Sequence, residues 1–287
     1  MTAAPTRMPP PPPRNGAPAV AAPSIKPRLG KPAADTMGSA VVLNGSEGVG
    51  KTSAACHAPA PLILMARGET GYVTLRNAGR VPDIDTLTDE AGKPKTIDSW
   101  AELLAVLDSD LSAYKTIILD AMGGFERLAH ELVCTRDYRG DWSEKGFANF
   151  QKGFEVAVSD WVGMLAKLDR LRHQGMNVIL LSHAKIGGVK NPDGSDYTQF
   201  TADCRKETWS VTARWADAVL FYRFVTVVDA VKQGKGKGIG GADREVRTEG
   251  RDAFVAKNRY GMPPVIEVPA DPAAAYQAIF GLINKPG

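Results

Sequence analysis

Eight consecutive residues, Gly45 to Thr52, have the types and spacing best suited to chemistry. Their sequence, Gly-Ser-Glu-Gly-Val-Gly-Lys-Thr, fits the P-loop pattern of two glycines separated by four residues and followed by Lys-Thr. Glycines let such a loop turn its backbone N–H groups toward a phosphate chain, and the helix that follows adds the positive end of its dipole. Lys51 would then reach the β- and γ-phosphates, while the Thr52 hydroxyl would bind Mg²⁺. Nucleotide contacts are expected from Gly45, Ser46, Glu47, Gly48, Val49, Gly50, Lys51, Thr52 and Ser53.

The segments on either side of this motif favour a nucleotide site over an ordinary glycine-rich turn. Residues 41–44 are typical of the end of a buried strand, and residues 53–57 of the first turns of a helix. A P-loop also needs a second Mg²⁺ ligand at the end of a neighbouring apolar strand. Asp120 ends the run Thr-Ile-Ile-Leu-Asp and is that candidate; the alternative is an aspartate that only begins the next turn.

Hydrolysis would also require a group that orients or deprotonates water. Glu69 follows the second predicted strand, at the edge of the sheet where a ligand would lie, and Glu47 lies inside the P-loop. Both remain candidates, and a solvated loop carboxylate is the alternative for Glu69. His183 ends the fourth predicted strand on the same edge, where it could contact the γ-phosphate or serve as a hydrogen-bonded structural residue.

The elements that must position these residues alternate between short apolar runs and helical stretches from residue 38 onward. The predicted fold class is α/β, with a mainly parallel central sheet flanked by helices and a C-terminal β-hairpin. The hairpin is predicted from two extended runs, near residues 222–231 and 244–257, around a loop containing Gly234 to Gly238. Further strands are predicted at 61–65, 116–120, 177–183 and 218–222, and helices at 98–111, 153–174 and 272–284.

Composition indicates a globular protein with one main domain. The chain has 287 residues, 44% of them hydrophobic and 23% charged, which allows a sizeable core. The net charge of +3 is too small to indicate nucleic acid by itself. Residues 1–35, rich in Pro and Ala, are predicted to be a disordered basic arm, and residues 36–287 the folded domain. The arm could dock a partner or tether nucleic acid, or it could be dispensable.

Cysteine usage and hydropathy predict the compartment. Cys56, Cys134 and Cys204 are odd in number and widely spaced, which argues against a disulfide framework or a zinc site. No apolar run approaches the roughly 20 residues of a membrane span, and the N-terminus lacks a signal-peptide core. We therefore expect a cytoplasmic protein with reduced thiols and no membrane partner.

The order of these motifs resembles the core of the RecA/DnaB-type P-loop ATPases. The resemblance rests on the P-loop, Glu69, Asp120, a polar residue ending the fourth strand, and Lys257-Asn258-Arg259. Over residues 38–268 the sequence is most similar to phage RecA-like nucleotide-binding proteins, the Sak-type single-strand annealing ATPases. That similarity lies in residues 67–71, 181–185 and 256–261. It implies a RecA-like fold, ATP and Mg²⁺ as ligands, and the cytoplasm of a bacterium or phage-infected cell. Where this family often has Gln, the chain has His183.

The resemblance also implies partners. Lys257 and Arg259 would act as fingers on the γ-phosphate of a neighbouring subunit, in a homo-oligomeric ring or filament; the alternative is two surface cations on a strand. Single-stranded DNA would contact the loops after the third and fourth strands, where cations alternate with aromatic residues. These residues are Arg136, Tyr138, Arg139, Trp142, Lys145, Lys185, Lys190, Tyr197, Phe200, Arg205 and Lys206. Because Asp137, Asp141, Asp193 and Asp196 interrupt them, solvated loops fit equally well.

Three functional hypotheses follow from the sequence. The first is an ATPase acting on single-stranded DNA in phage-type recombination or annealing, with a helicase-like or loader role as a variant. The second is a DNA-binding assembly module that uses ATP as a switch with negligible turnover. The third, a small-molecule kinase, is disfavoured because no arginine-rich lid segment or acceptor pocket is evident in the sequence.

Overall fold

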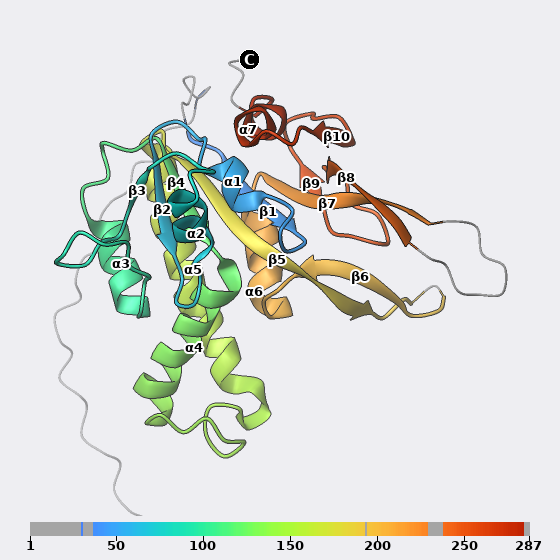
Figure 1. Ribbon diagram of the computed structural model, residues 1–287. Helices are drawn as coiled ribbons and strands as arrows, with labels where there is room; N and C mark the ends of the chain where they lie inside the picture. The colour runs from blue at the N-terminus through green and yellow to red at the C-terminus, as the bar shows by residue number, and fades with distance from the viewer. Residues whose placement is uncertain (1–29, 31–36, 193, 229–237, 284–287) are drawn as a thin grey trace, which may run out of the picture. The chain divides into compact units, whose positions relative to one another are not determined.

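The P-loop follows the first strand of a ten-stranded sheet (Figure 1). The computed structural model describes residues 30, 37–192, 194–228 and 238–283, and the sheet is formed within these residues. The predicted basic arm and the predicted glycine-rich hairpin loop fall outside these residues, apart from Gly30 and Gly238. The strand order is β10-β8-β7-β1-β5-β4-β2-β3, with β6 paired to β5 and β9 paired to β7. The strands are β1 (Ala40–Gly45), β2 (Pro61–Met65), β3 (Asp85–Thr86), β4 (Thr116–Asp120), β5 (Asn177–Val189), β6 (Tyr197–Ala202), β7 (Ala218–Val228), β8 (Gly238–Arg247), β9 (Lys257–Asn258) and β10 (Val265–Val268).

The predicted fold class is confirmed, because the central strands are parallel and β7 and β8 form an antiparallel hairpin. The predicted second run of that hairpin, near residues 244–257, was wrong beyond Arg247, since β8 runs from Gly238 to Arg247. Strand β1 pairs in parallel with β5 on one side and β7 on the other, and β4 pairs in parallel with β5 and β2. Strand β7 then turns back into β8 in antiparallel pairing. The central strands are apolar throughout because both faces of the sheet are covered by helices.

Successive residues of the buried strands point to opposite faces, and each face packs against its own set of helices. Leu43 faces a core that includes residues of α1, α2 and α7, whereas Val42 faces a core formed with α3, α4, α5 and α6. The first set comprises α1 (Lys51–Ala55), α2 (Gly71–Asn77) and α7 (Pro272–Phe280). The second set comprises α3 (Trp100–Asp108), α4 (Met122–Tyr138), α5 (Lys152–His173) and α6 (Lys206–Trp215). In the described residues, no helix has the length and apolar character needed to cross a membrane.

This topology brings the predicted site residues to one edge of the sheet. Gly45, at the end of β1, is in register with His183 on β5, and Asp120 ends β4 in register with Met65 at the end of β2. Because these strands are parallel, their carboxyl ends lie together, which is where ligands bind in open α/β sheets.

Two predicted loops proved to be regular structure. The prediction of a loop after β4 that carries Arg136 and Tyr138 was wrong, since both residues lie on α4. That helix buries an apolar stripe at helical spacing, including Met122, Phe125, Ala129 and Val133, so burial accounts for the helix. The predicted loop after His183 is an extension of β5, which pairs with β6 in an antiparallel ribbon that continues past the parallel sheet (Figure 1).

Candidate functional site

The P-loop holds its lysine inside the loop. Lys51 is 6% exposed, and its Nζ donates hydrogen bonds of 2.8 Å to the carbonyl oxygens of Gly45 and Ser46. Burial lowers the pKa of Lys51 to about 8, against the opposing charges of Asp120, Glu47 and Glu69. The ammonium therefore stays mostly protonated at neutral pH. It occupies the centre of the loop, where phosphate oxygens can replace the two carbonyls as its partners.

The metal-side residues are already in contact. The Thr52 hydroxyl donates a 2.8 Å hydrogen bond to Oδ2 of Asp120, which is 4% exposed at the end of β4. Burial raises the pKa of Asp120 to about 6, while the hydrogen bond from Thr52 opposes that rise. Asp120 is therefore ionised at neutral pH. A hydroxyl and a carboxylate fit Mg²⁺, which takes one or two protein carboxylates and completes its shell with phosphates and water. Among the described residues, no group of three His, Cys, Asp or Glu side chains could hold a metal ion. Mg²⁺ would therefore take most of its ligands from phosphates and water.

Glu69 and His183 lie together beside the same loop. Oε1 of Glu69, in the loop after β2, is 3.6 Å from Nε2 of His183 on β5. Glu69 raises the pKa of His183, although partial burial and the charge of Lys51 act in the opposite direction. Nδ1 of His183 is buried without a hydrogen-bond partner among the described residues. The structure thus brings Glu69, His183 and Asp120 to one side of Lys51, whereas Glu47 is exposed within the loop.

Replacing Glu69 with glutamine is expected to slow ATP turnover by roughly a hundredfold or more while leaving nucleotide affinity unchanged, because it removes a general base and keeps the side-chain size. The measurement is steady-state ATPase activity together with nucleotide affinity from calorimetry. Glu47→Gln is the matched control and should retain turnover. The opposite pattern, with full activity in Glu69→Gln and loss in Glu47→Gln, would transfer the role to Glu47.

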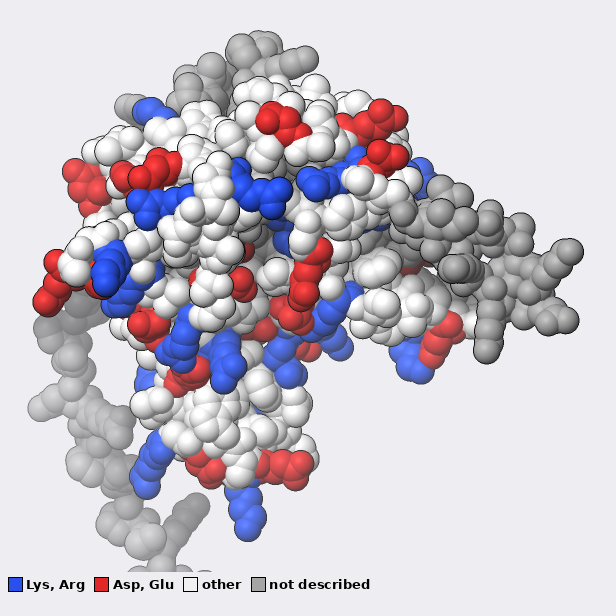
Figure 2. All heavy atoms as spheres, viewed as in Figure 1, with Lys and Arg blue, Asp and Glu red and all other residues white. Residues whose placement is uncertain are grey.

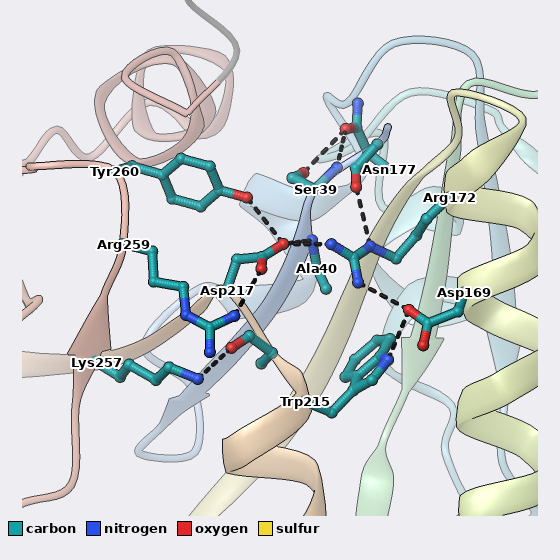
Figure 3. Close-up of polar contacts among 12 residues, drawn as sticks. Ser39, Ala40, Asp169, Arg172, Asn177, Trp215, Asp217, Lys257, Arg259 and Tyr260 are labelled. Carbon is teal, nitrogen blue, oxygen red and sulfur yellow. Dashed lines mark hydrogen bonds and ion pairs between the residues drawn. The ribbon is translucent and has the colours of Figure 1, made fainter. Parts of the chain in front are cut away.

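Lys257 and Arg259 lie at the opposite edge of the sheet, where each has partners in its own chain (Figure 3). Lys257 Nζ donates to the carbonyl oxygens of Ala213, Arg214 and Ala216, at distances of 3.0, 3.0 and 2.5 Å, and so caps the C-terminal end of α6. Arg259 Nη1 lies 3.2 Å from Oδ1 of Asp217. The predicted action of these cations on a neighbouring subunit stays a prediction.

Asp217 joins several elements at that edge. Its Oδ2 accepts hydrogen bonds from the backbone N–H of Ala40 and from the Tyr260 hydroxyl, both at 3.2 Å, and also from Arg172. Arg172 is 4% exposed and is held as well by Asp169 and by the Gly38 carbonyl oxygen. The network fixes α5, β1, β7 and the segment after β9 against one another, whereas Arg259 contributes the half-exposed outer contact (Figure 3).

Most cations of the predicted DNA-binding set have partners on the protein. Arg136 forms ion pairs with Asp137 and Asp160 at 2.9 and 3.0 Å, and Lys185 pairs with Asp203 at 3.3 Å. On the face shown in Figure 2, positive and negative side chains are interspersed and form no continuous basic stripe among the residues drawn in colour. The other members lie as follows: Arg139, Trp142 and Lys145 between α4 and α5, Lys190 after β5, Tyr197 and Phe200 on β6, and Arg205 and Lys206 at the start of α6.

The aromatic members of the set differ in exposure. Phe200 stacks on Phe221 with ring centroids 5.3 Å apart, and Phe221 stacks in turn on Phe254, so this ring belongs to the packing of the molecule. Trp142 is 49% exposed, and Phe150, which the sequence did not single out, is 88% exposed in the segment joining α4 to α5. Both rings are exposed enough to stack on bases.

Two residues beside the P-loop were missed from the sequence. A β-carbon placed on Gly50 would lie 3.1 Å from Nη1 of Arg244 and 3.6 Å from Oη of Tyr222. Tyr222 falls in the predicted fifth strand, but its approach to Gly50 depends on the way β7 passes beside β1. Arg244 lies on β8, and its position depends on the hairpin register, for which the sequence carries no signal.

The sequence also matches a known protein family. A family model described as an AAA domain matches residues 37–260. No curated protein matches the sequence. Among solved structures, the RadB recombinase is 10% identical with a TM-score of 0.43, covering 83% of this chain and 90% of that one. A KaiC-like protein from the archaeon Pyrococcus horikoshii is 12% identical with a TM-score of 0.43, covering 83% of this chain and 88% of that one.

Proposed function

Because the chain belongs to the AAA domain family, we propose that it binds Mg-ATP at the P-loop and hydrolyses it. The observation that carries this proposal is the hydrogen bond of Thr52 to the buried Asp120, next to a lysine held inside the loop. A protein that used this glycine-rich turn only as structure would have no need to bury both charges at one edge of the sheet.

Each residue of the site has a role in this reaction. Lys51 would exchange the loop carbonyls for the β- and γ-phosphates, and Thr52 and Asp120 would hold Mg²⁺, which would neutralise charge on the phosphates. Glu69 would orient and deprotonate the attacking water, and His183, in register with Gly45, lies where it can respond to the γ-phosphate. Glu69 follows β2, while Asp120 lies on β4 and His183 on β5, so the carboxyl edge of the sheet brings these residues together.

We further propose that the ATPase acts on single-stranded DNA in recombination or annealing and works as a ring or filament. The DNA proposal is supported by the resemblance to Sak-type annealing ATPases and by Trp142 and Phe150, whose exposed rings could stack on bases. The proposal of an assembly is supported by the position of Arg259. Gly45 pairs with Tyr222, and Asn258 pairs with Ala218 four residues earlier on β7, roughly 13 Å along the strand. Arg259 therefore lies at the far end of β7 from the P-loop of its own chain, so an action on a γ-phosphate would require a neighbouring subunit.

The proposed function is tested by measuring ATP hydrolysis with and without single-stranded DNA. DNA is expected to stimulate turnover several-fold, and its binding should weaken steeply as salt rises because phosphate contacts release counterions. Duplex DNA of the same sequence is the control and should bind less well. The double variant Trp142→Ala and Phe150→Ala should lose the preference for single strands, with Val162→Ala as a control for an exposed apolar residue on α5.

Two outcomes would replace the proposed DNA-dependent ATPase activity with another function. DNA binding that needs ATP but is accompanied by negligible turnover would favour the assembly-switch alternative. ATP turnover that DNA does not affect, together with the absence of DNA binding at low salt, would remove single-stranded DNA as the partner and leave the ATPase activity standing.

A further inference from the structure

Arg244 reaches the P-loop from the side opposite to the catalytic carboxylates. In the sheet, Asp120 on β4 and His183 on β5 lie to one side of β1, whereas β7 and β8 lie to the other. Arg244 is in register with Phe224 across the β7–β8 hairpin, just beyond the level at which Tyr222 pairs with Gly45. Its Nη1 lies 3.1 Å from the position that a β-carbon on Gly50 would occupy, so the guanidinium borders the last glycine of the loop.

Among the residues that the structure describes, the charge of Arg244 has no acidic partner. Its neighbours on the hairpin, Arg223 and Arg247, both pair with the buried Glu245, at 2.7 and 2.9 Å. Arg244 forms no ion pair within the described ranges, and its guanidinium lies 5.6 Å from the centroid of the Phe224 ring. Its Nε is buried without a hydrogen-bond partner. An arginine held half-buried in this way is stabilised by an anion that arrives from outside the protein.

Tyr222 supplies a second unpartnered group at the same place. Its side chain is fully buried, and its Oη, 3.6 Å from the same point above Gly50, has no hydrogen-bond partner among the described residues. Burial raises the pKa of Tyr222, while the neighbouring Arg244 guanidinium opposes that rise through polar contact and through its charge, so the hydroxyl is neutral and can donate. Buried polar atoms without partners are rare in folded proteins, and two that converge on one loop indicate a ligand.

The path of a nucleotide's phosphates can be inferred from the P-loop. If Mg²⁺ and the γ-phosphate were held at Thr52 and Asp120, the other phosphates would lie along the loop backbone. The backbone of a P-loop cradles the α- and β-phosphates, and Gly50 belongs to that cradle. The guanidinium of Arg244 lies beside Gly50, on the β7–β8 side of the loop.

We propose that Arg244, with the hydroxyl of Tyr222, binds the α- and β-phosphates of the nucleotide held by its own subunit. The inference rests on the proposed nucleotide site and adds a contact that is made equally to ATP and ADP. It assigns the β7–β8 hairpin a direct part in retaining nucleotide, separate from the hydrolytic residues after β2 and on β4 and β5. Arg244 is a binding residue in cis, whereas Arg259 can act only on a neighbour.

Calorimetric titration of wild type and Arg244→Gln with Mg-ADP and with a non-hydrolysable Mg-ATP analogue tests this assignment. Both nucleotides are expected to bind the variant roughly ten- to a hundredfold more weakly, the loss typical of a hydrogen bond to a charged group. Arg244→Lys should recover part of the affinity because it keeps the charge but lacks the planar fork. Arg223→Gln is the matched control, since it removes a positive charge from the same hairpin on the opposite face of the sheet.

The outcomes separate this inference from the function on which it rests. Failure of wild type to bind either nucleotide would overturn the proposed function and the inference together. Tight binding by wild type and equally tight binding by Arg244→Gln would overturn the inference alone. A loss confined to the ATP analogue would also overturn it, because that pattern marks a γ-phosphate contact.

A measurement on wild-type protein keeps the test valid if Arg244→Gln does not fold. Phenylglyoxal modifies accessible arginines, and the modified positions can be mapped by mass spectrometry. Mg-ADP is expected to protect Arg244 at least tenfold while leaving the modification of Arg223 unchanged. Equal modification of Arg244 with and without saturating Mg-ADP would show that the guanidinium does not touch the nucleotide.

Discussion

Lys51→Ala is expected to abolish the stabilisation that Mg-ATP gives to the protein. Among the described residues, the Lys51 ammonium is the only side-chain cation inside the loop. It donates there to the carbonyl oxygens of Gly45 and Ser46, which phosphate oxygens would replace. A ligand at a hundred times its Kd stabilises a folded protein by about 2.7 kcal/mol, which raises the Tm of a domain of this size by roughly 5–10 °C. Wild type should show that shift, and the variant none.

The control for Lys51→Ala must remove a lysine without touching the loop. Lys93→Ala serves this purpose, because Lys93 is exposed and its backbone bonds to Asp89 in a short surface turn. Lys51→Met is a second variant, which keeps the volume of the buried stem and isolates the loss of charge. If either Lys51 variant is stabilised by Mg-ATP as strongly as wild type, the nucleotide site lies elsewhere.

The buried strands of the site and the polar residues next to them were predictable, because both are recognised from short stretches of sequence. Apolar runs such as residues 116–120 and 61–65 are compatible only with strands covered on both faces, and β4 and β2 have those same bounds. Asp120 then follows at a strand end, whereas His183 lies within β5, at the point where its parallel pairing with β1 stops. Parallel pairing places such ends at one edge, so their proximity to the P-loop needed no knowledge of side-chain geometry.

Residues whose positions depend on long-range pairing were not predictable in the same way. Arg136 was assigned to a loop because the RecA resemblance implies a DNA-binding loop after the third strand, whereas it lies on α4, whose buried stripe is apolar. Arg244 approaches Gly50 because it pairs with Phe224 on β7, in a register that changes further along the hairpin, between Phe224 and Thr226. A shift of one residue would send this side chain to the other face of the hairpin, and the sequence does not specify such shifts.

The environment of Lys257 was also unforeseen. The sequence suggested a free cation at the far edge of the sheet, whereas its Nζ binds three carbonyl oxygens at the end of α6. A lysine near a helix C-terminus interacts favourably with the last carbonyls and the negative end of the dipole, so fold stability alone accounts for Lys257. Arg259 differs because its side chain is 56% exposed and forms one ion pair among the described residues, with Asp217.

Arg259→Ala is expected to slow ATP turnover by roughly a thousandfold or more without weakening nucleotide binding, as for an arginine that stabilises transferring phosphate from a neighbouring subunit. The loss in stability should stay below about 1 kcal/mol, because exposed ion pairs contribute little. Arg251→Ala is the matched control, as Arg251 is likewise exposed and pairs at 3.6 Å with an exposed carboxylate, Glu249. The measurements are steady-state turnover, nucleotide affinity and thermal unfolding of each variant.

Mixing separates a shared active site from an indirect effect of Arg259. Subunits with Arg259→Ala keep an intact P-loop, and subunits with Lys51→Ala keep an intact Arg259. When the two are combined, some interfaces pair an intact P-loop with an intact arginine, so activity should reappear although neither variant is active alone. Wild-type specific activity should rise with protein concentration for the same reason. Full turnover by a monomer, or the absence of recovery in the mixture, would show that Arg259 acts only through its contact with Asp217 at the far edge of the sheet.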